Sequence, residues 1–199
     1  TAFARKGVDE PTPVDLNDLV NREAELLRRT TLQKLEIQVD LAEGLPAVMG
    51  DASALANGLM NLCVNAVDAM PEGGQLTLST QRLPDGRAEL KVADTGIGMP
   101  PEVLQRATEP FFTTKPQGKG TGLGLAMVYG LVQAHGGVMG IQSVQGEGTT
   151  ITMTFPGVDQ RQAPEEPEVK PGKPARPLRV LVVDDDDLIR TSVPAMLQS

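Results

Sequence analysis

The sequence of 199 residues predicts an α/β fold, a two-layer sandwich in which helices cover one face of a mixed sheet. Helical and strand-like hydrophobic periods alternate along residues 14–156. Residues 75–83 and 87–93 are typical of a strand pair, because a Pro-Asp-Gly turn joins them. Residues 149–155 alternate apolar side chains with threonines, as in a strand that is buried on one face.

Each element follows from the spacing of its apolar residues. Leucines at helical spacing between Leu16 and Leu27 predict the first helix, and alternation from Leu35 to Leu41 predicts the first strand. Paired glycines close the last predicted helix after His135. The predicted helices span residues 15–29, 51–70, 101–107 and 122–135. The predicted strands span residues 35–41, 75–83, 87–93, 138–144 and 149–155.

Prolines divide the chain into parts. Six of the sixteen prolines lie between Pro156 and Pro177, in a segment with few large apolar residues. We therefore expect a main domain at residues 14–156, a linker at 157–177 and a short separate piece at 178–199.

Composition excludes several classes of function. The net charge of −8 and the absence of tryptophan argue against a nucleic-acid partner. The single cysteine, Cys63, excludes an internal disulfide bond and a cysteine-based zinc site. No apolar run approaches the roughly 18–20 residues of a membrane span, so we expect no direct membrane contact and a cytoplasmic location, although a longer parent protein could be membrane-anchored.

The predicted helix 51–70 carries a polar stripe. At about 100° per residue, Asn57, Asn61, Asn65 and Asp68 fall on one face, and leucines and alanines fall on the opposite face. One interpretation is a solvated outer face. The other is a row of amide oxygens that face a ligand, since Mg²⁺ accepts amide oxygens and takes its other ligands from phosphates and water.

Two glycine-containing segments suggest a second and a third part of a site. Asp94 follows a predicted strand and is followed by Gly96, Gly98 and Met99, so its carboxylate could receive an exocyclic amine of a flat ring; the alternative is a simple turn that Asp94 caps. The other segment leads into a helix, where backbone amides and the helix dipole favour an anion; the alternative is a mobile loop that binds no phosphate. It consists of Gly118, Lys119, Gly120, Thr121, Gly122, Leu123, Gly124 and Leu125.

A pair of aromatic residues precedes this loop. Phe111 and Phe112 lie in the segment from Glu109 to Lys115, and we expect their rings to be buried, either as anchors of a movable lid or as plain core.

Five motifs, taken together and in this order, resemble the ATP-binding catalytic domain of bacterial sensor histidine kinases. They lie at Asn61–Asn65, Asp94–Gly98, residues 109–115, 118–125 and 146–150. The resemblance covers about residues 14–156 and implies the Bergerat fold. It also implies ATP and Mg²⁺ as cofactors.

The resemblance assigns roles to individual residues. It implies that Asp94 binds the adenine amine and that Asn65 binds Mg²⁺, with Asn61 near the phosphates. Hydrolytic relatives carry glutamate at the position of Asn61, and an amide cannot act as a general base, so we expect slow hydrolysis and transfer to a histidine instead. The expected nucleotide-binding set is Asn61, Asn65, Asp68, Asp94, Gly96, Gly98, Met99, Lys115, Gly118, Lys119, Gly120, Thr121, Gly122, Leu123, Gly124, Leu125 and Thr150.

The acceptor histidine of the family is expected outside this sequence. His135 is the only histidine, and its place at a helix end suggests capping or packing. Residues 1–13 resemble the end of the family's dimerisation hairpin and a linker. We therefore expect this piece to be a monomer, its parent to be a homodimer, and the partners to be ATP or ADP, the histidine-bearing hairpin and a receiver domain.

Residues 178–199 suggest that receiver domain. An apolar run is followed by Asp184 and Asp185, which resemble the acidic Mg²⁺ pocket of a response-regulator receiver. We expect a truncated strand–helix start of such a domain, disordered or docked, in a hybrid kinase. Two alternatives to the kinase stay open: an ATPase that drives conformational change, and a regulatory module that binds a nucleotide or cyclic dinucleotide without phosphotransfer.

Overall fold

The computed structural model describes residues 11–30, 35–116 and 120–158. Its helices are α1 (Leu16–Thr30), α2 (Ala52–Ala69), α3 (Pro101–Leu104) and α4 (Gly124–Ala134). Its strands are β1 (Thr12–Val14), β2 (Leu35–Asp40), β3 (Val48–Gly50), β4 (Gly74–Arg82), β5 (Ala88–Asp94), β6 (Val138–Val144) and β7 (Gly148–Phe155).

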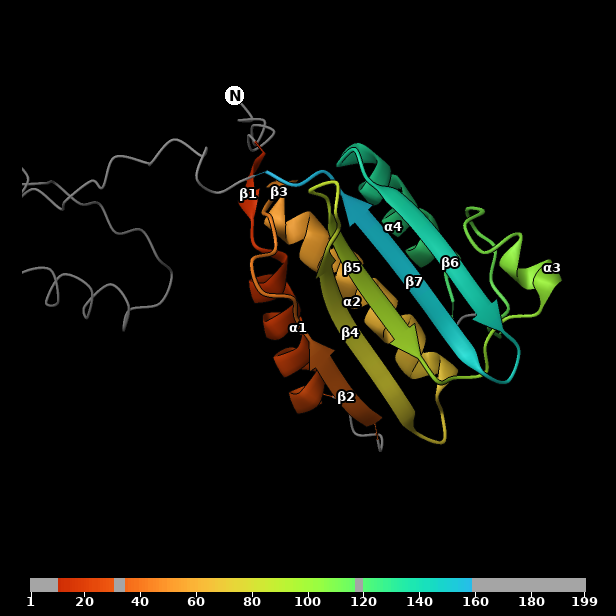
Figure 1. Ribbon diagram of the computed structural model, residues 1–199. Coiled ribbons are helices and arrows are strands. Elements are labelled where there is room, and N and C mark those ends of the chain that lie inside the picture. The colour runs from red at the N-terminus through yellow and green to blue at the C-terminus, as the bar shows by residue number, and fades with distance from the viewer. Residues whose placement is uncertain (1–10, 31–34, 117–119, 159–199) are drawn as a thin grey trace, which may run out of the picture. The chain divides into compact units, whose positions relative to one another are not determined.

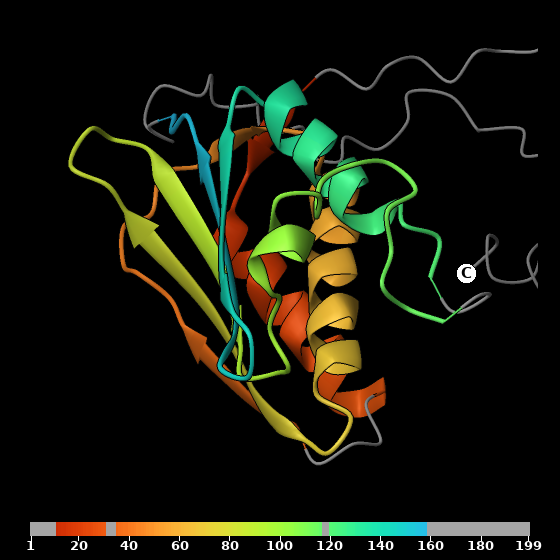
Figure 2. The same ribbon diagram turned by 90° about the vertical axis from the view of Figure 1, so that its right-hand side faces the viewer.

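The main sheet is mixed and has five strands in the order β2-β4-β5-β7-β6 (Figure 1). β2 pairs with β4 in parallel, and the other neighbours are antiparallel. Helices α1, α2 and α4 cover one face, and Figure 2 shows the opposite face without helices. The predicted two-layer α/β sandwich is confirmed.

The core lies between the helices and the covered face of the sheet. Buried Leu59 and Leu62 of α2 contribute to it from the helix layer, and Leu76, Leu78 and Phe155 contribute from the strands. The opposite face of α2 carries the asparagines, as the helical spacing predicted. Burial of the leucine stripe against the sheet therefore orients the asparagine stripe away from the core.

Two short elements were not predicted. β1 pairs with β3 in a separate two-stranded sheet, with Val14 opposite Val48. Three-residue strands carry no readable period, and the prolines around Thr12 were interpreted only as a break. The helix predicted at 101–107 is also shorter than expected, because α3 ends at Leu104 and turns follow it.

The end of the described chain is held against the domain. Val158 donates its backbone N–H to the Ala47 carbonyl at 2.8 Å and forms an isolated bridge with it. An isolated bridge thus reaches the second residue of the predicted linker at 157–177, beyond the end of β7 at Phe155. The rest of that linker, the piece at 178–199 and residues 1–10 lie outside the described residues.

Candidate functional site

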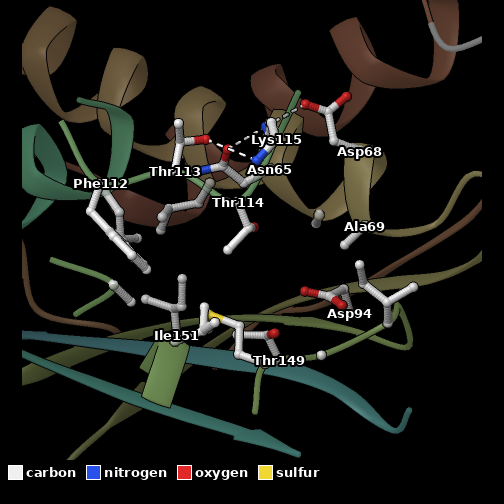
Figure 3. A pocket seen from close by; sticks show the side chains of 18 of the residues that line it. Asn65, Asp68, Ala69, Asp94, Phe112, Thr113, Thr114, Lys115, Thr149 and Ile151 are labelled. Carbon is white, nitrogen blue, oxygen red and sulfur yellow. Dashed lines mark hydrogen bonds and ion pairs between the residues drawn. The ribbon is translucent and has the colours of Figure 1, made fainter. Parts of the chain in front are cut away.

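A pocket of about 400 Å³ lies between the C-terminal half of α2 and the covered face of the sheet. Figure 3 shows Asn65 and Asp68 on one side, together with Lys115, and Asp94, Thr149 and Ile151 on the other. The pocket is lined by Leu62, Asn65, Ala66, Asp68, Ala69, Val92, Asp94, Ile97, Gly98, Met99, Val103, Ala107, Phe112, Thr113, Thr114, Lys115, Pro116, Leu125, Thr149 and Ile151.

Asp94 supplies the carboxylate of the sheet side. It is the last residue of β5, pairs with Thr149 of β7, and accepts a hydrogen bond from the Gly96 backbone N–H at 2.9 Å. Burial raises the pKa of Asp94, and the backbone N–H groups of Gly96 and Thr149 partly counter this rise. A half-buried, ionised carboxylate beside apolar residues can accept hydrogen bonds from an amine.

The glycines after Asp94 let the backbone pass close to its neighbours. A β-carbon on Gly96 would lie 2.6 Å from the Ala69 carbonyl oxygen. Gly98 has φ +60°, and a β-carbon there would lie 2.0 Å from the Val144 oxygen. Both positions therefore require glycine, and they hold this loop against the end of α2 and against β6.

Helix α2 supplies the polar wall opposite the sheet. Asp51 caps the helix, since its carboxylate accepts from the N–H groups of Ser53 and Ala54. Asn65 and Asp68 line the pocket one turn apart near its other end. The local sequence places Asn65 and Asp68 at the pocket because the leucines of the same helix are buried, whereas Asn57 and Asn61 of the same stripe do not line it.

The segment after α3, residues 111–116, closes another side of the pocket and is called the lid segment below. Lys115 donates to Asp68 Oδ2 at 2.6 Å and to Asn65 Oδ1 at 3.2 Å. Phe112 lines the pocket, and the Arg106 guanidinium lies 4.2 Å from the centre of its ring.

The expectation that both phenylalanine rings are buried is wrong for Phe111, which is 75% exposed, and Phe112 is only half-buried. Its φ is +67°, and its backbone N–H donates to the Gly122 oxygen at 2.9 Å. This contact with the glycine loop, rather than ring burial, accounts for the position of Phe111.

The glycine loop leads into α4 beside the polar wall. A β-carbon on Gly124 would lie 3.6 Å from Asn65 Nδ2, so the start of α4 is next to Asn65. The helix begins after Leu123, whose own side chain makes no capping hydrogen bond and whose backbone N–H donates to Thr121 Oγ1 at 3.3 Å. The backbone N–H groups of a first helical turn lack intrahelical partners, and together with the helix dipole they make this end a suitable place for an anion.

The pocket brings together seven of the residues that the sequence predicted for nucleotide binding. These are Asn65, Asp68, Asp94, Gly98, Met99, Lys115 and Leu125. The predicted residues that do not line it are Asn61, Gly96, Gly120, Thr121, Gly122, Leu123, Gly124 and Thr150. Gly118, Lys119, Asp184 and Asp185 lie outside the described residues.

Sequence reasoning missed Thr149, which lines the pocket where Thr150 was predicted to contribute. Thr149 faces the same side of β7 as Ile151, and Thr150 faces the other side. The alternation of β7 was visible in the sequence and could have identified Thr149. The apolar lining from Val103 of α3 and from Ala107 just after it had no comparable signal, because it depends on how this part of the chain packs beside the pocket.

The family model described as "Histidine kinase-, DNA gyrase B-, and HSP90-like ATPase" matches residues 50–159, which is more than half of the chain. The chain belongs to this family. Within it, the similar proteins are sensor kinases, and the matched residues form an ATP-binding catalytic domain of the sensor histidine kinase type.

Three relatives illustrate the similarity of this ATPase-family domain. Sensor kinase CckA of Brucella abortus (strain 2308) is 36% identical over all of this chain and 23% of the relative. Sporulation kinase E of Bacillus subtilis (strain 168) is 34% identical over 71% of this chain and 18% of the relative. The crystal structure of full-length ShkA in complex with AMPPNP matches with a TM-score of 0.66 and 33% identity, over 75% of this chain and 31% of that one.

The chain thus spans less than a third of the length of each of these relatives. No helix in the described ranges is both long and apolar enough to cross a membrane.

Proposed function

We propose that this ATPase-family domain donates the γ-phosphoryl group of ATP to a histidine that lies outside residues 1–199. The observation that carries this proposal is the opposition of Asp94 and Asn65 across one pocket, beside the start of α4. In the transfer, the bond between the γ-phosphorus and its bridging oxygen breaks, a phosphorus–nitrogen bond forms at a neutral imidazole, and ADP leaves.

Asp94 is proposed to recognise the base. Its carboxylate is held at the end of β5 by the N–H groups of Gly96 and Thr149 and lines the pocket, where we propose that it accepts the amine of adenine. Apolar Val92, Ile97 and Ile151 line the same region and provide surfaces for a flat ring. This arrangement supports adenine rather than a base that presents a carbonyl oxygen there, since two acceptors would face each other.

Asn65 is proposed to hold Mg²⁺ together with the phosphates. The site fits this ion, because Asn65 Oδ1 already accepts from an ammonium group and Asp68 adds a second oxygen facing the same cation. Bound Mg²⁺ would neutralise charge on the phosphate oxygens. The glycine loop and the start of α4 are proposed to bind the rest of the phosphate chain.

Asn61 is proposed to lie near the phosphates without activating water. It is one turn before Asn65 on α2 and is half-buried. Its amide has no basic group that could take a proton from water, so we expect slow hydrolysis by the isolated domain.

His135 is not a plausible acceptor. Its Nδ1 lies 2.8 Å from the Leu131 oxygen, and its Nε2 accepts from the Asp51 N–H, so both ring nitrogens are engaged. Asp51 and Asn65 are 14 residues apart on α2, which corresponds to about 21 Å along the helix. His135, the expected cap of α4, therefore lies at the opposite end of α2 from the pocket.

The longer protein is proposed to be a hybrid kinase that is cytoplasmic or membrane-anchored. In this proposal residues 1–13 end a histidine-bearing hairpin and residues 14–156 form the catalytic domain. Residues 157–177 are then a linker to a receiver domain that starts at 178–199. The similarity to CckA over the whole chain, against 71% for sporulation kinase E, supports relatedness beyond the catalytic domain. Asp184 and Asp185 are the proposed acidic pair of the receiver. We propose a homodimeric parent and a monomeric isolated piece.

The test is calorimetric titration with a non-hydrolysable ATP analogue and Mg²⁺. We expect one equivalent to bind, and Asp94→Asn to weaken binding by at least about 30-fold, because an amide can present a donor to the adenine amine. Asp40→Asn is the matched control, since Asp40 is an exposed residue at the end of β2.

Folded wild-type chain that binds no analogue would overturn the proposal. A cyclic dinucleotide would then be titrated, which tests the regulatory-module alternative. If the analogue binds as expected, a separate hairpin carrying the acceptor histidine is added with ATP to measure transfer.

A further inference from the structure

One cation connects the lid segment to α2. The Lys115 ammonium lies 2.6 Å from Asp68 Oδ2 and 3.2 Å from Asn65 Oδ1, and Figure 3 shows both interactions as dashed lines. The two oxygens are three residues apart on one helix face, so a single charge can bridge them. Lys115 is 50 residues from Asn65 in the sequence, and the contact therefore fixes the position of the lid segment relative to α2.

The oxygens that hold Lys115 are those that a hard cation would use. Asn65 Oδ1 is the amide oxygen assigned to the magnesium side of the site, and Asp68 is the carboxylate next to it. A doubly charged ion on Asn65 and an ammonium 3.2 Å from the same oxygen would repel each other at contact distance. Lys115 and Mg²⁺ therefore compete for Asn65.

The charges that line the pocket favour such an exchange. Its ionisable lining residues, within the described part of the chain, are Asp68, Asp94 and Lys115. Lys115 neutralises Asp68 while no other cation is bound. A cation that arrives with the nucleotide can take over this neutralisation, which leaves the Lys115 ammonium without its partner and available to other groups.

The contact adds to others that hold the lid segment. The Phe111 end is held separately, by the hydrogen bond from the Phe111 N–H to the Gly122 oxygen and by the Arg106 guanidinium against the Phe112 ring. Lys115 is itself positioned locally, since its backbone N–H donates to Thr113 Oγ1 at 3.1 Å. Release of its ammonium would free the end of the lid segment near Pro116 and leave the Phe111 end attached.

We propose that Lys115 is an exchangeable counter-cation: it occupies Asn65 and Asp68 in the nucleotide-free chain and leaves them when nucleotide binds with Mg²⁺, but not when nucleotide binds alone. This inference rests on the proposed function. It makes Lys115 a positioning residue that couples the lid segment to the metal.

The first experiment tests the contact itself by amine acylation, read by mass spectrometry. Lys91 is the internal comparison, because its side chain is 39% exposed against 33% for Lys115 and it pairs with Glu89 on the uncovered face of the sheet. Asp68→Asn should raise the labelling rate of Lys115 about two- to fivefold, as expected for loss of an exposed ion pair, and leave that of Lys91 unchanged. The matched control, Glu89→Gln, should leave Lys115 unchanged.

The second experiment follows the ¹⁵N-labelled lysine ammonium signal of the wild-type chain by NMR, with Lys115→Gln for assignment. Saturating ADP without Mg²⁺ should leave the Lys115 signal in place, and Mg²⁺ added to the ADP complex should shift it. The signal of Asp68→Asn without nucleotide should already be displaced from the wild-type position.

Two NMR results would overturn the inference: a Lys115 signal that moves fully with metal-free ADP, and one that does not move with Mg²⁺ and ADP. A Lys115 labelling rate that Asp68→Asn does not change would also overturn it. Calorimetry on the same sample separates this from the proposed function. ADP that binds without the predicted Lys115 response contradicts only the exchange, and absence of any nucleotide binding contradicts the proposed function itself.

Discussion

The two sides of the pocket are held in different ways. On the sheet side, Asp94 belongs to a paired strand, and the loop after it is fixed by backbone contacts at Gly96 and Gly98. On the lid side, the contacts include a backbone hydrogen bond at Phe111, the Arg106 guanidinium against the Phe112 ring and the ammonium of Lys115. The comparison teaches that the carboxylate proposed to recognise the base is preorganised by the sheet. The side proposed to bind the phosphates depends more on side-chain contacts, which we propose to be exchangeable.

The largest expected effect concerns the reactivity of the Cys63 thiol. Cys63 lies on the buried face of α2, which supports both sides of the pocket. Burial, with a smaller contribution from the negative charge of Glu23, raises the pKa of Cys63 to about 12. An unperturbed thiol has a pKa of ~8.5, so the thiolate fraction at pH 8 should fall about 1,000-fold in the folded chain. A thiol-reactive dye measured at pH 8 should label native protein at least that much more slowly than unfolded protein. Rates within tenfold of each other would show that this face opens readily.

The next effect tests the rigidity of the sheet side. Gly98→Ala should lower the free energy of unfolding by about 2–4 kcal/mol, because its positive φ and its contact with the Val144 oxygen exclude a β-carbon. Gly86→Ala is the control: Gly86 has φ +84° but nothing within 4 Å of a β-carbon, so we expect a loss of about 1 kcal/mol. Urea unfolding measures both, and equal losses would argue against a tightly held loop.

The third effect is on the pH dependence of nucleotide binding. Burial raises the pKa of Asp94, and a protonated carboxyl accepts an amine hydrogen poorly. The affinity for nucleotide should therefore reach its full value above this raised pKa. Below it, the affinity should fall by up to about tenfold per pH unit, and the fall should begin at a pH above the ordinary aspartate pKa of ~3.9. The free energy of unfolding depends on pH in the opposite sense. Because the pKa of Asp94 is raised in the folded chain, its ionisation destabilises the folded state, so this contribution lowers the free energy of unfolding as the pH rises from the ordinary aspartate value through the raised pKa.

Titration of an ATP analogue by calorimetry between pH 4 and pH 7 measures this dependence, with unfolding monitored separately at each pH. Affinity that stays constant down to the ordinary aspartate range would indicate that Asp94 does not contact the base in its ionised form.

The smallest effect tests the lid side. Gly122 has φ +65°, and a β-carbon there would lie 2.4 Å from the Phe111 carbonyl carbon, so Gly122→Ala introduces a clash comparable to that of Gly98→Ala. We expect the lid segment to yield locally, with less than about 1 kcal/mol lost in global stability and nucleotide affinity reduced about three- to tenfold. Global destabilisation as large as that of Gly98→Ala would remove the distinction between the two sides.

Much of the fold was predictable because its signals are local. β6 matches its predicted range of 138–144, and the polar and apolar stripes of α2 follow from helical spacing alone. Those signals could not reveal that Thr12–Val14 pairs with Val48–Gly50, because pairing of three-residue segments depends on where the rest of the chain brings them.

The candidate site shows the same division. Asp94 and Asn65 were identified from their local motifs, and the pocket contains both. Thr149 was missed by one position, although the alternation of β7 indicated the correct face. The pairing of Lys115 with Asp68 had no local signal. The two residues are 47 positions apart and belong to different motifs, and neither motif predicts a contact with the other.

By itself, then, the sequence determined which residue types are available, which faces of α2 and of the strands are apolar, and where glycine permits close approach of the backbone. These properties depend on the 3.6- and two-residue periods and on local sterics. Only the tertiary structure decided that the amide of Asn65 accepts from a lysine of the lid segment, and that His135 lies at the far end of α2. Such contacts between distant segments arise when helices pack on a sheet, because burial of the shared core sets the distances between polar groups that no local pattern encodes.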